Sequence, residues 1–346
     1  MAAHVVTDPL RRLPVGVATG VGSLPGDDID RALAMVFDEL PDLPHLPELP
    51  ARGPGADMVG RTATGLVDLP VDLSPSGWRL VARPGLDRRR GQELLGADLD
   101  ALLPVAGPGY DGPLKVPLAG PWTLAASVQL PRGGPVLADS GAVRDLTESL
   151  VETVRAHIDD VRRRVPHARL VLQIDEPSLP AVLAGRIPTE SGLGVVTTPE
   201  ASTAQDVLAR VVAAAQEVPV VVHCCAGDAP LTLCAGAGAT AVGFDAIAAE
   251  PDREVLGSLV ESGISLWLGV VPALGPGSPP TAGSVARMVR TLWHELGFVP
   301  DQLPESVVVT PACGLAGASM GWAHSAYRLL RQVAQALSEA PEGIRG

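Results

Sequence analysis

The sequence predicts an α/β protein whose residues 1–346 form a single (β/α)8 TIM barrel domain, with a long loop excursion after the first strand. Short apolar runs that end in glycine, proline or polar residues alternate with longer amphipathic stretches, an order typical of a parallel sheet. Eight such runs are present, the number that closes a barrel, although an open doubly wound sheet shows the same alternation. Hydrophobic residues make up 46% of the chain and aromatic residues only 3%, which suits an aliphatic sheet covered by helices.

The expected strands, in chain order, are residues 15–21, 78–82, 114–118, 170–174, 219–223, 239–244, 265–271 and 306–310. The clearest amphipathic stretches between them predict helices over residues 142–165, 201–216, 252–262, 282–296 and 322–337. Residues 41–75 are rich in proline and glycine and have no clear periodicity. We expect this segment to be the excursion, lying over the mouth of the barrel.

The formal net charge of −13 argues against a nucleic-acid partner, because such surfaces need clustered lysine and arginine. The one short basic cluster, residues 87–90, is expected to be a solvated loop or a helix start. No apolar run reaches the ~18 residues of a membrane span. The N-terminal stretch MAAHVVTDPLRR lacks the pattern of a signal peptide. We therefore expect a cytoplasmic protein without a membrane partner, whose four cysteines serve metal binding or catalysis rather than disulfides.

The stretch VVHCCAGDAP, residues 221–230, places a histidine and two cysteines at the end of an expected strand. Side chains alternate along a strand, so His223 and Cys225 face one side and Cys224 faces the other. Asp245 ends the next strand and Cys313 follows the last one. A histidine, an aspartate and two cysteines from these strand ends would make a tetrahedral zinc shell. The alternative is that the cysteines are small buried residues and Asp245 is a helix cap.

Two further motifs follow expected strands. In QIDEPSLP, residues 173–180, Asp175 and Glu176 would bind a substrate ammonium group or act as acid and base. The alternative is that one of them caps a helix and the other is solvated. In ATGVGSLPG, residues 18–26, the glycine spacing is wrong for a dinucleotide loop. The motif suits a turn whose backbone binds a substrate carboxylate, or a plain connecting loop.

Four stretches together, GVGSLPG, KVPLAGPWTL, QIDEPSL and the ordered set HCC, GFD and PACGL, resemble the cobalamin-independent methionine synthase family. The resemblance is to its catalytic C-terminal domain, in a barrel superfamily shared with uroporphyrinogen decarboxylase. It implies a (β/α)8 barrel in which Zn2+ activates the thiol of homocysteine for methylation. The implied zinc ligands are His223, Cys225, Asp245, where the family has glutamate, and Cys313.

The same resemblance implies that Asp175 binds the substrate amine and that Ser23 lies in the substrate-binding turn. Glu48 would substitute for the family's amine-binding glutamate. The family's catalytic histidine falls on Leu274, which leaves the methyl donor open among a folate, a corrinoid protein and a small methylated compound. Two other functions remain as alternatives: a zinc- or thiol-binding barrel without catalysis, and a uroporphyrinogen decarboxylase-like lyase. The lyase would need basic residues for several carboxylates, which the net charge disfavours.

Overall fold

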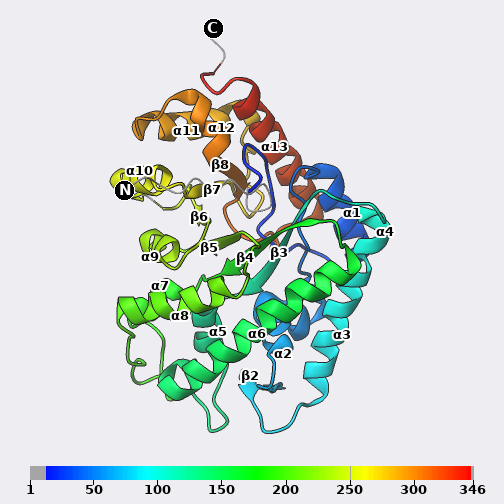
Figure 1. The fold of residues 1–346 in the computed structure, drawn as a ribbon, viewed down its shortest axis with the longest axis vertical. Coiled ribbons are helices and arrows are strands. Elements are labelled where there is room, and N and C mark those ends of the chain that lie inside the picture. The colour runs from blue at the N-terminus through cyan, green and yellow to red at the C-terminus, as the bar shows by residue number, and fades with distance from the viewer. Residues whose placement is uncertain (1–12, 250, 344–346) are drawn as a thin grey trace.

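The computed structural model describes residues 13–249 and 251–343, and a six-stranded parallel sheet lies at its centre (Figure 1). Each strand pairs with the next one along the chain, and the sheet curls into a half-barrel. The six strands are β3 (Pro113–Ala119), β4 (Arg169–Asp175), β5 (Val220–Cys224), β6 (Ala241–Asp245), β7 (Ser265–Val271) and β8 (Val307–Pro311). Since parallel neighbours need crossover connections, this order places helices between the strands and brings all carboxyl ends to one edge.

Two short extended segments continue the curl at the edges of the sheet. Ala18 forms a parallel bridge with Val309 of β8, and His45 forms one with Lys115 of β3. A third parallel bridge links the two segments to each other through Ser23 and Glu48. The expected strand at residues 15–21 therefore lies beside β8, but as an isolated bridge rather than a regular ladder.

The expected strand at residues 78–82 is wrong as a member of the central sheet. Gly77–Leu80 forms β2, which pairs antiparallel with β1 (Val71–Ser74) in a separate two-stranded sheet. The segment that lies beside β3 is instead around His45, inside the predicted excursion. Pro44 and Pro47 flank it and cannot donate to a ladder, which explains both the isolated bridge and the missing sequence signal.

The five predicted helices are confirmed, with small shifts at their ends. They are α6 (Ser140–Arg164), α8 (Ala201–Ala213), α10 (Arg253–Glu261), α11 (Ala282–Glu295) and α13 (Met320–Glu339). The other helices are α1 (Ile29–Glu39), α2 (Met58–Gly65), α3 (Leu86–Asp100), α4 (Leu102–Ala106), α5 (Pro121–Ser127), α7 (Leu179–Leu183), α9 (Leu231–Gly236) and α12 (Leu303–Ser306). The basic cluster at residues 87–90 lies in the first turn of α3, so it is a helix start.

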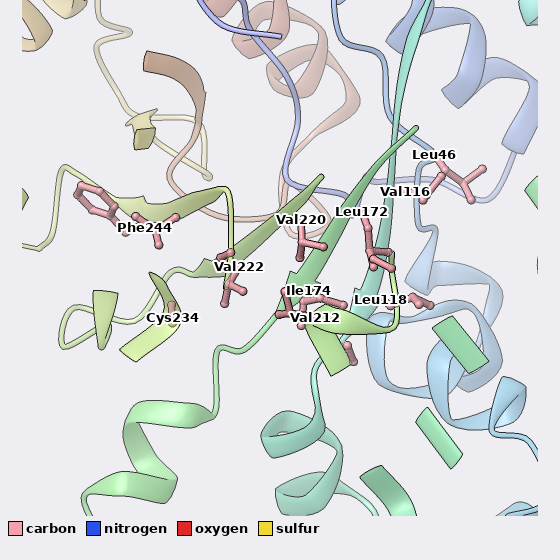
Figure 2. Close-up of a cluster of buried hydrophobic side chains, with 14 of the residues drawn as sticks. Leu46, Val116, Leu118, Leu172, Ile174, Val212, Val220, Val222, Cys234 and Phe244 are labelled. Atoms are coloured by element: carbon pink, nitrogen blue, oxygen red, sulfur yellow. The ribbon is translucent and has the colours of Figure 1, made fainter. Parts of the chain in front are cut away.

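The helices cover the outer face of the sheet, where the main core lies (Figure 2). Alternate strand residues point outward into it, and they include Val116, Leu118, Leu172, Ile174, Val220 and Val222. The residues between them point inward. At the amino ends of the strands this inner face holds an apolar cluster of Leu43, Val171, Val221, Ala241, Trp267 and Val308. Towards the carboxyl ends the inward residues of β4 and β5 become polar.

No helix within residues 13–249 and 251–343 is both long and apolar enough to cross a membrane. The N-terminal stretch used for the localisation prediction lies outside the described residues.

Candidate active site at the carboxyl ends of the strands

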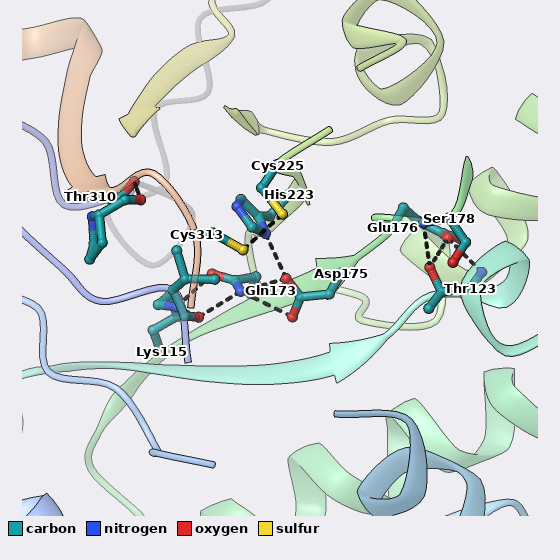
Figure 3. Close-up of polar contacts among 12 residues, drawn as sticks. Lys115, Thr123, Gln173, Asp175, Glu176, Ser178, His223, Cys225, Thr310 and Cys313 are labelled. Atoms are coloured by element: carbon teal, nitrogen blue, oxygen red, sulfur yellow. Dashed lines mark hydrogen bonds and ion pairs between the residues drawn. The ribbon is translucent and has the colours of Figure 1, made fainter. Parts of the chain in front are cut away.

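Asp175 and His223 meet because the register of β4 and β5 pairs them directly. Nδ1 of His223 lies 2.8 Å from Oδ1 of Asp175, and both side chains are buried (Figure 3). A carboxylate can only accept, so Nδ1 donates to it, and in the neutral imidazole this leaves the lone pair on Nε2. A Cβ on Gly243 of β6 would come within 3.1 Å of the His223 ring, so this glycine leaves space for the imidazole. The pair therefore has a fixed tautomer and a fixed ring position.

Cys225 and Cys313 bring two sulfur atoms to the same place. Their Sγ atoms are 3.0 Å apart, and both residues are half-buried (Figure 3). The hydrogen bond between the thiols lowers the pKa of Cys313, against the effect of burial, and raises the pKa of Cys225. Cys224 is buried, as expected for the opposite side of the strand, and burial raises its pKa to about 12.

Ser23 and Glu48 lie near this cluster. The backbone oxygen of Ser23 accepts from Leu315 N at 2.8 Å, and a Cβ on Gly314 would meet Ser23 Oγ at 2.1 Å. Ser23 is therefore packed against the loop that carries Cys313. Glu48 is only 4% exposed, and its Oε1 has no hydrogen-bond partner in the described part of the chain. Burial raises the pKa of Glu48 to about 7, with Arg61 opposing that rise.

Glu176 is a predicted site residue whose carboxylate lies apart from this cluster (Figure 3). Its Oε1 accepts from the backbone N of Trp122 at 2.9 Å. Its Oε2 accepts from the backbone N and the hydroxyl of Thr123 at 2.8 and 2.7 Å. Burial raises the pKa of Glu176 to about 7, and these bonds oppose the rise. The carboxylate thus caps the start of α5, and its substrate contact stays a prediction.

Asp245 is the second predicted site residue whose carboxylate binds neighbouring backbone groups. Its Oδ1 accepts from the backbone N of Ile247 at 2.8 Å and of Ala248 at 3.0 Å. Asp245 therefore caps the turn after β6 rather than a helix, which was the alternative drawn from the sequence, because the next helix begins only at Arg253. Both bonds fall on Oδ1, so Oδ2 is left for another contact, and the role of Asp245 as a metal ligand stays a prediction.

The donor chemistry nevertheless fits a soft metal cation. Among residues 13–249 and 251–343, no group of three or more histidine, cysteine, aspartate or glutamate side chains stands ready-arranged as a metal site. Two facing thiols and an imidazole with an available Nε2 are, however, the ligand types that zinc prefers. A carboxylate on the far nitrogen of the ring is the usual partner of a metal-binding histidine, and Asp175 occupies that place.

Sequence reasoning missed two buried polar residues under the cluster. Lys115 is fully buried in β3, and its Nζ donates to Gln173 Oε1 at 2.5 Å and to Val21 O at 2.7 Å. Gln173 Nε2 in turn donates to both oxygens of Asp175, at 2.8 and 3.0 Å. A signal was available, because a lone lysine at an inward position of an apolar strand needs a partner inside the barrel.

A buried ionic group holds the segment that carries Glu48. Asp98 Oδ2 accepts from Arg52 at 2.7 Å and from Arg61 at 3.0 Å, and all three side chains are largely buried. Arg61 also donates to Pro47 O, the residue before Glu48, at 2.9 Å. The position of Glu48 is thus set from α2 and α3 as well as by its bridge to Ser23.

Residues 118–336, well over half of the chain, match the family model described as cobalamin-independent synthase, catalytic domain. The chain belongs to this family. The match confirms the resemblance found in the sequence motifs. Membership assigns the protein to the methyltransferases of the methionine synthase type. No curated protein matches the sequence.

The fold agrees with that of a solved family member. A B12-independent methionine synthase from Shewanella sp. W3-18-1, in complex with selenomethionine, superposes with a TM-score of 0.60. The alignment covers 94% of this chain and 98% of that one at 12% identity, a level that supports the fold alone. A 2,3-dimethylmalate lyase aligns over 96% of this chain and 86% of its own at 14% identity, with a TM-score of only 0.37. That score is too low to support an argument.

Proposed function

We propose that the protein is a zinc-dependent S-methyltransferase that methylates the thiol of homocysteine or of a similar small molecule. The observation that carries the proposal is the sulfur pair of Cys225 and Cys313 beside the Asp175-bound His223, in a chain of this family. We further propose that the segments around Ala18 and His45 are the first two strands of a complete (β/α)8 barrel. Their bridges to β8 and β3, and to each other, support this closure.

His223, Cys225 and Cys313 would hold the zinc, with Asp245 as the predicted fourth ligand through Oδ2. Bound zinc would make the substrate sulfur a thiolate at neutral pH, so that no protein base is needed for this. The protein side chains keep the donor set in place. Asp175 fixes the tautomer of His223, and both of these side chains are buried.

The charges around the site suit the amino-acid end of homocysteine. Within the part of the chain that the structure describes, Glu48 Oε1 is buried without a hydrogen-bond partner, and Asp175 lies close enough to raise the pKa of Glu48 further. A substrate ammonium group supplies the donor that Glu48 Oε1 lacks, and ion pairing with Glu48 and Asp175 would hold the substrate. The turn at Ser23, packed against the Cys313 loop, would bind the substrate carboxylate. These roles place the thiol end of the substrate towards the sulfur pair.

A non-catalytic thiol-binding barrel is the second candidate, and Leu274 favours it. The family's catalytic histidine was expected at this position, and Leu274 lies 62% exposed in the loop after β7. His294 and His324 do not replace it, because they lie on α11 and α13, and His324 pairs with Glu39 at 3.1 Å. A methyl group on a folate nitrogen needs a proton during transfer, whereas a sulfonium or a methylcorrinoid donor does not.

The test is homocysteine methylation with these three donor classes side by side, using zinc-loaded protein. We expect methionine with a pre-activated donor and a rate with methyltetrahydrofolate lower by roughly 10²–10⁴-fold, the usual value of general acid assistance. Asp175→Asn is expected to lose activity with every donor, while an exposed Asp30→Asn change on α1 serves as the matched control. Efficient turnover with the folate would show that the proton comes from elsewhere. Thiol binding without turnover by any donor would favour the second candidate.

A further inference from the structure

Lys115 is a buried lysine that the proposed reaction does not use. Its side chain has 0% exposure, and both of its hydrogen-bond acceptors are neutral, namely the Gln173 amide and the Val21 carbonyl. Burial lowers the pKa of Lys115 to about 7, with Asp175 and Glu48 opposing the change. A buried amine is unfavourable unless its contacts offset the loss of solvation. The position of Lys115 under the site therefore indicates that its contacts have a function.

The contacts of Lys115 decide which way the Gln173 amide points. As an ammonium group Lys115 can only donate, so the amide oxygen must face it and the NH2 group must face the other way. The NH2 group then reaches both oxygens of Asp175 and Val21 O (Figure 3). A flipped amide would place its NH2 group against the Lys115 amine and its oxygen against three acceptor oxygens. Lys115 and these three acceptor oxygens together exclude the flipped orientation.

The consequence reaches His223 through Asp175. With both carboxylate oxygens held by Gln173, Asp175 cannot turn away from Nδ1 of His223. Two side chains, those of Gln173 and Asp175, thus connect Lys115 to the imidazole through three successive hydrogen bonds. The inward side-chain phase of β3, β4 and β5 places these four residues on the same inner face of the barrel.

We propose that Lys115 is a positioning residue that acts through Gln173 to hold Asp175, and through it His223, in the orientation that the site uses. The function of this orientation rests on the proposed methyl transfer. The hydrogen-bond chain itself does not depend on that proposal. The simpler reading is that Lys115 only contributes to the stability of the barrel interior. If Lys115 acts through Gln173, replacing Lys115 has no further effect on zinc affinity once Gln173 has been replaced. If Lys115 only stabilises the interior, the effects of the two replacements are independent.

The experiment compares Lys115→Met, Gln173→Met and the double variant, with Tyr327→Phe as the matched control. Tyr327 is fully buried and loses one side-chain bond, 2.8 Å long, to His45 Nε2, while the backbone bridge of His45 to Lys115 is left in place. Zinc affinity is measured by competition with a chromogenic chelator, and thermal unfolding monitors the fold. Each single variant should lose roughly 10–100-fold in zinc affinity, the usual effect of removing a partner behind a metal ligand. The double variant should lose no more than the weaker-binding single variant.

A second readout needs no metal. In metal-free protein the hydrogen-bonded Nδ1 proton of His223 should give a slowly exchanging NMR signal, assigned by its loss in His223→Gln. We expect this signal to persist in Tyr327→Phe and to broaden or vanish in Lys115→Met and Gln173→Met. If Lys115→Met does not fold, Gln173→Glu replaces it, because that change keeps a partner for Lys115 but turns the donor towards Asp175 into an acceptor.

The outcomes separate this inference from the proposed function. An altered Nδ1 signal in a protein that binds no zinc would support the positioning role and contradict the proposed function. Losses of zinc affinity that add up in the double variant would overturn the positioning role. So would an unchanged Nδ1 signal in Lys115→Met, or in Gln173→Glu where that variant replaces it, even if the melting temperature falls.

Discussion

Cys224 and Cys225 are neighbours in the chain, yet their side chains lie on opposite faces of the sheet. Cys225 faces Cys313 across 3.0 Å, whereas Cys224 is 1% exposed with Cys234 and Glu176 among its electrostatic neighbours. Strand alternation was enough to predict this difference from the sequence. What alternation could not predict is the local use of Asp245 and Glu176, because a carboxylate at a strand end can equally cap the turn or helix that follows.

We predict that Cys313→Ser loses most of the bound zinc and that Cys224→Ser keeps it. A serine hydroxyl is a much harder ligand than a thiolate and is not deprotonated as readily, so one bond of the shell is lost. The measurement is zinc content per chain after gel filtration, with thermal unfolding to show that both variants fold. Equal zinc loss in the two variants would contradict the arrangement of the sulfur pair.

Glu48 makes stability depend on pH in a definite direction. Its pKa is raised by burial from an ordinary 4.5 to about 7 in the folded chain. Between these two values the unfolded chain has already released the proton that the folded chain still holds. The contribution of Glu48 to the free energy of unfolding is therefore fully present below about pH 4.5 and is lost as the pH rises towards 7. In total this one group contributes roughly 3 kcal/mol.

Glu48→Gln should remove that part of the pH dependence. We expect the variant to gain stability relative to the wild type when urea unfolding at pH 8 is compared with unfolding at pH 5. The exposed Glu93→Gln change on α3 is the matched control and should show no such gain. A difference between variant and wild type that is the same at both pH values would contradict the burial of an unpaired carboxylate.

At the scale of elements, the helices were predicted well and the first two strands poorly. Long amphipathic stretches such as those of α6 and α13 carry their own periodic signal. The segment around His45 has no such signal, since prolines interrupt it and a single bridge joins it to β3. The apolar run at Trp78 looks like a core strand, but the Ser74–Gly77 turn closes it into a hairpin with β1 instead. Pairing partners of this kind depend on the tertiary fold rather than on local sequence.

The junction of β3 and α5 tolerates no side chain at Gly120. A Cβ there would come within 2.4 Å of Glu176 Oε1, and that carboxylate is held by three hydrogen bonds. We predict that Gly120→Ala destabilises the protein by roughly 1–3 kcal/mol, as overpacking usually does. Gly96→Ala on α3, where a Cβ meets nothing within 4 Å, is the control and should be stabilising. Similar shifts in the urea midpoint for both variants would count against the rigid capping of α5 by Glu176.

For the whole molecule, the sequence motifs predicted the family, and the order of strands in the sheet follows from the alternation of elements. The position of the site at the carboxyl ends of the strands follows from the same topology. The polar chain from Lys115 to His223 could not be predicted in the same way, because it depends on the relative register of three strands. Its members are separated along the chain, and only the curled sheet brings them together.

The most direct measurement of the central claim is X-ray absorption at the zinc edge, before and after addition of homocysteine. If the sulfur pair and His223 hold zinc for a thiol substrate, homocysteine should add one sulfur neighbour at roughly 2.3 Å, the usual Zn–S distance. Homoserine, which has a hydroxyl in place of the thiol, should leave the spectrum unchanged. A zinc shell that does not change at saturating homocysteine would contradict the account.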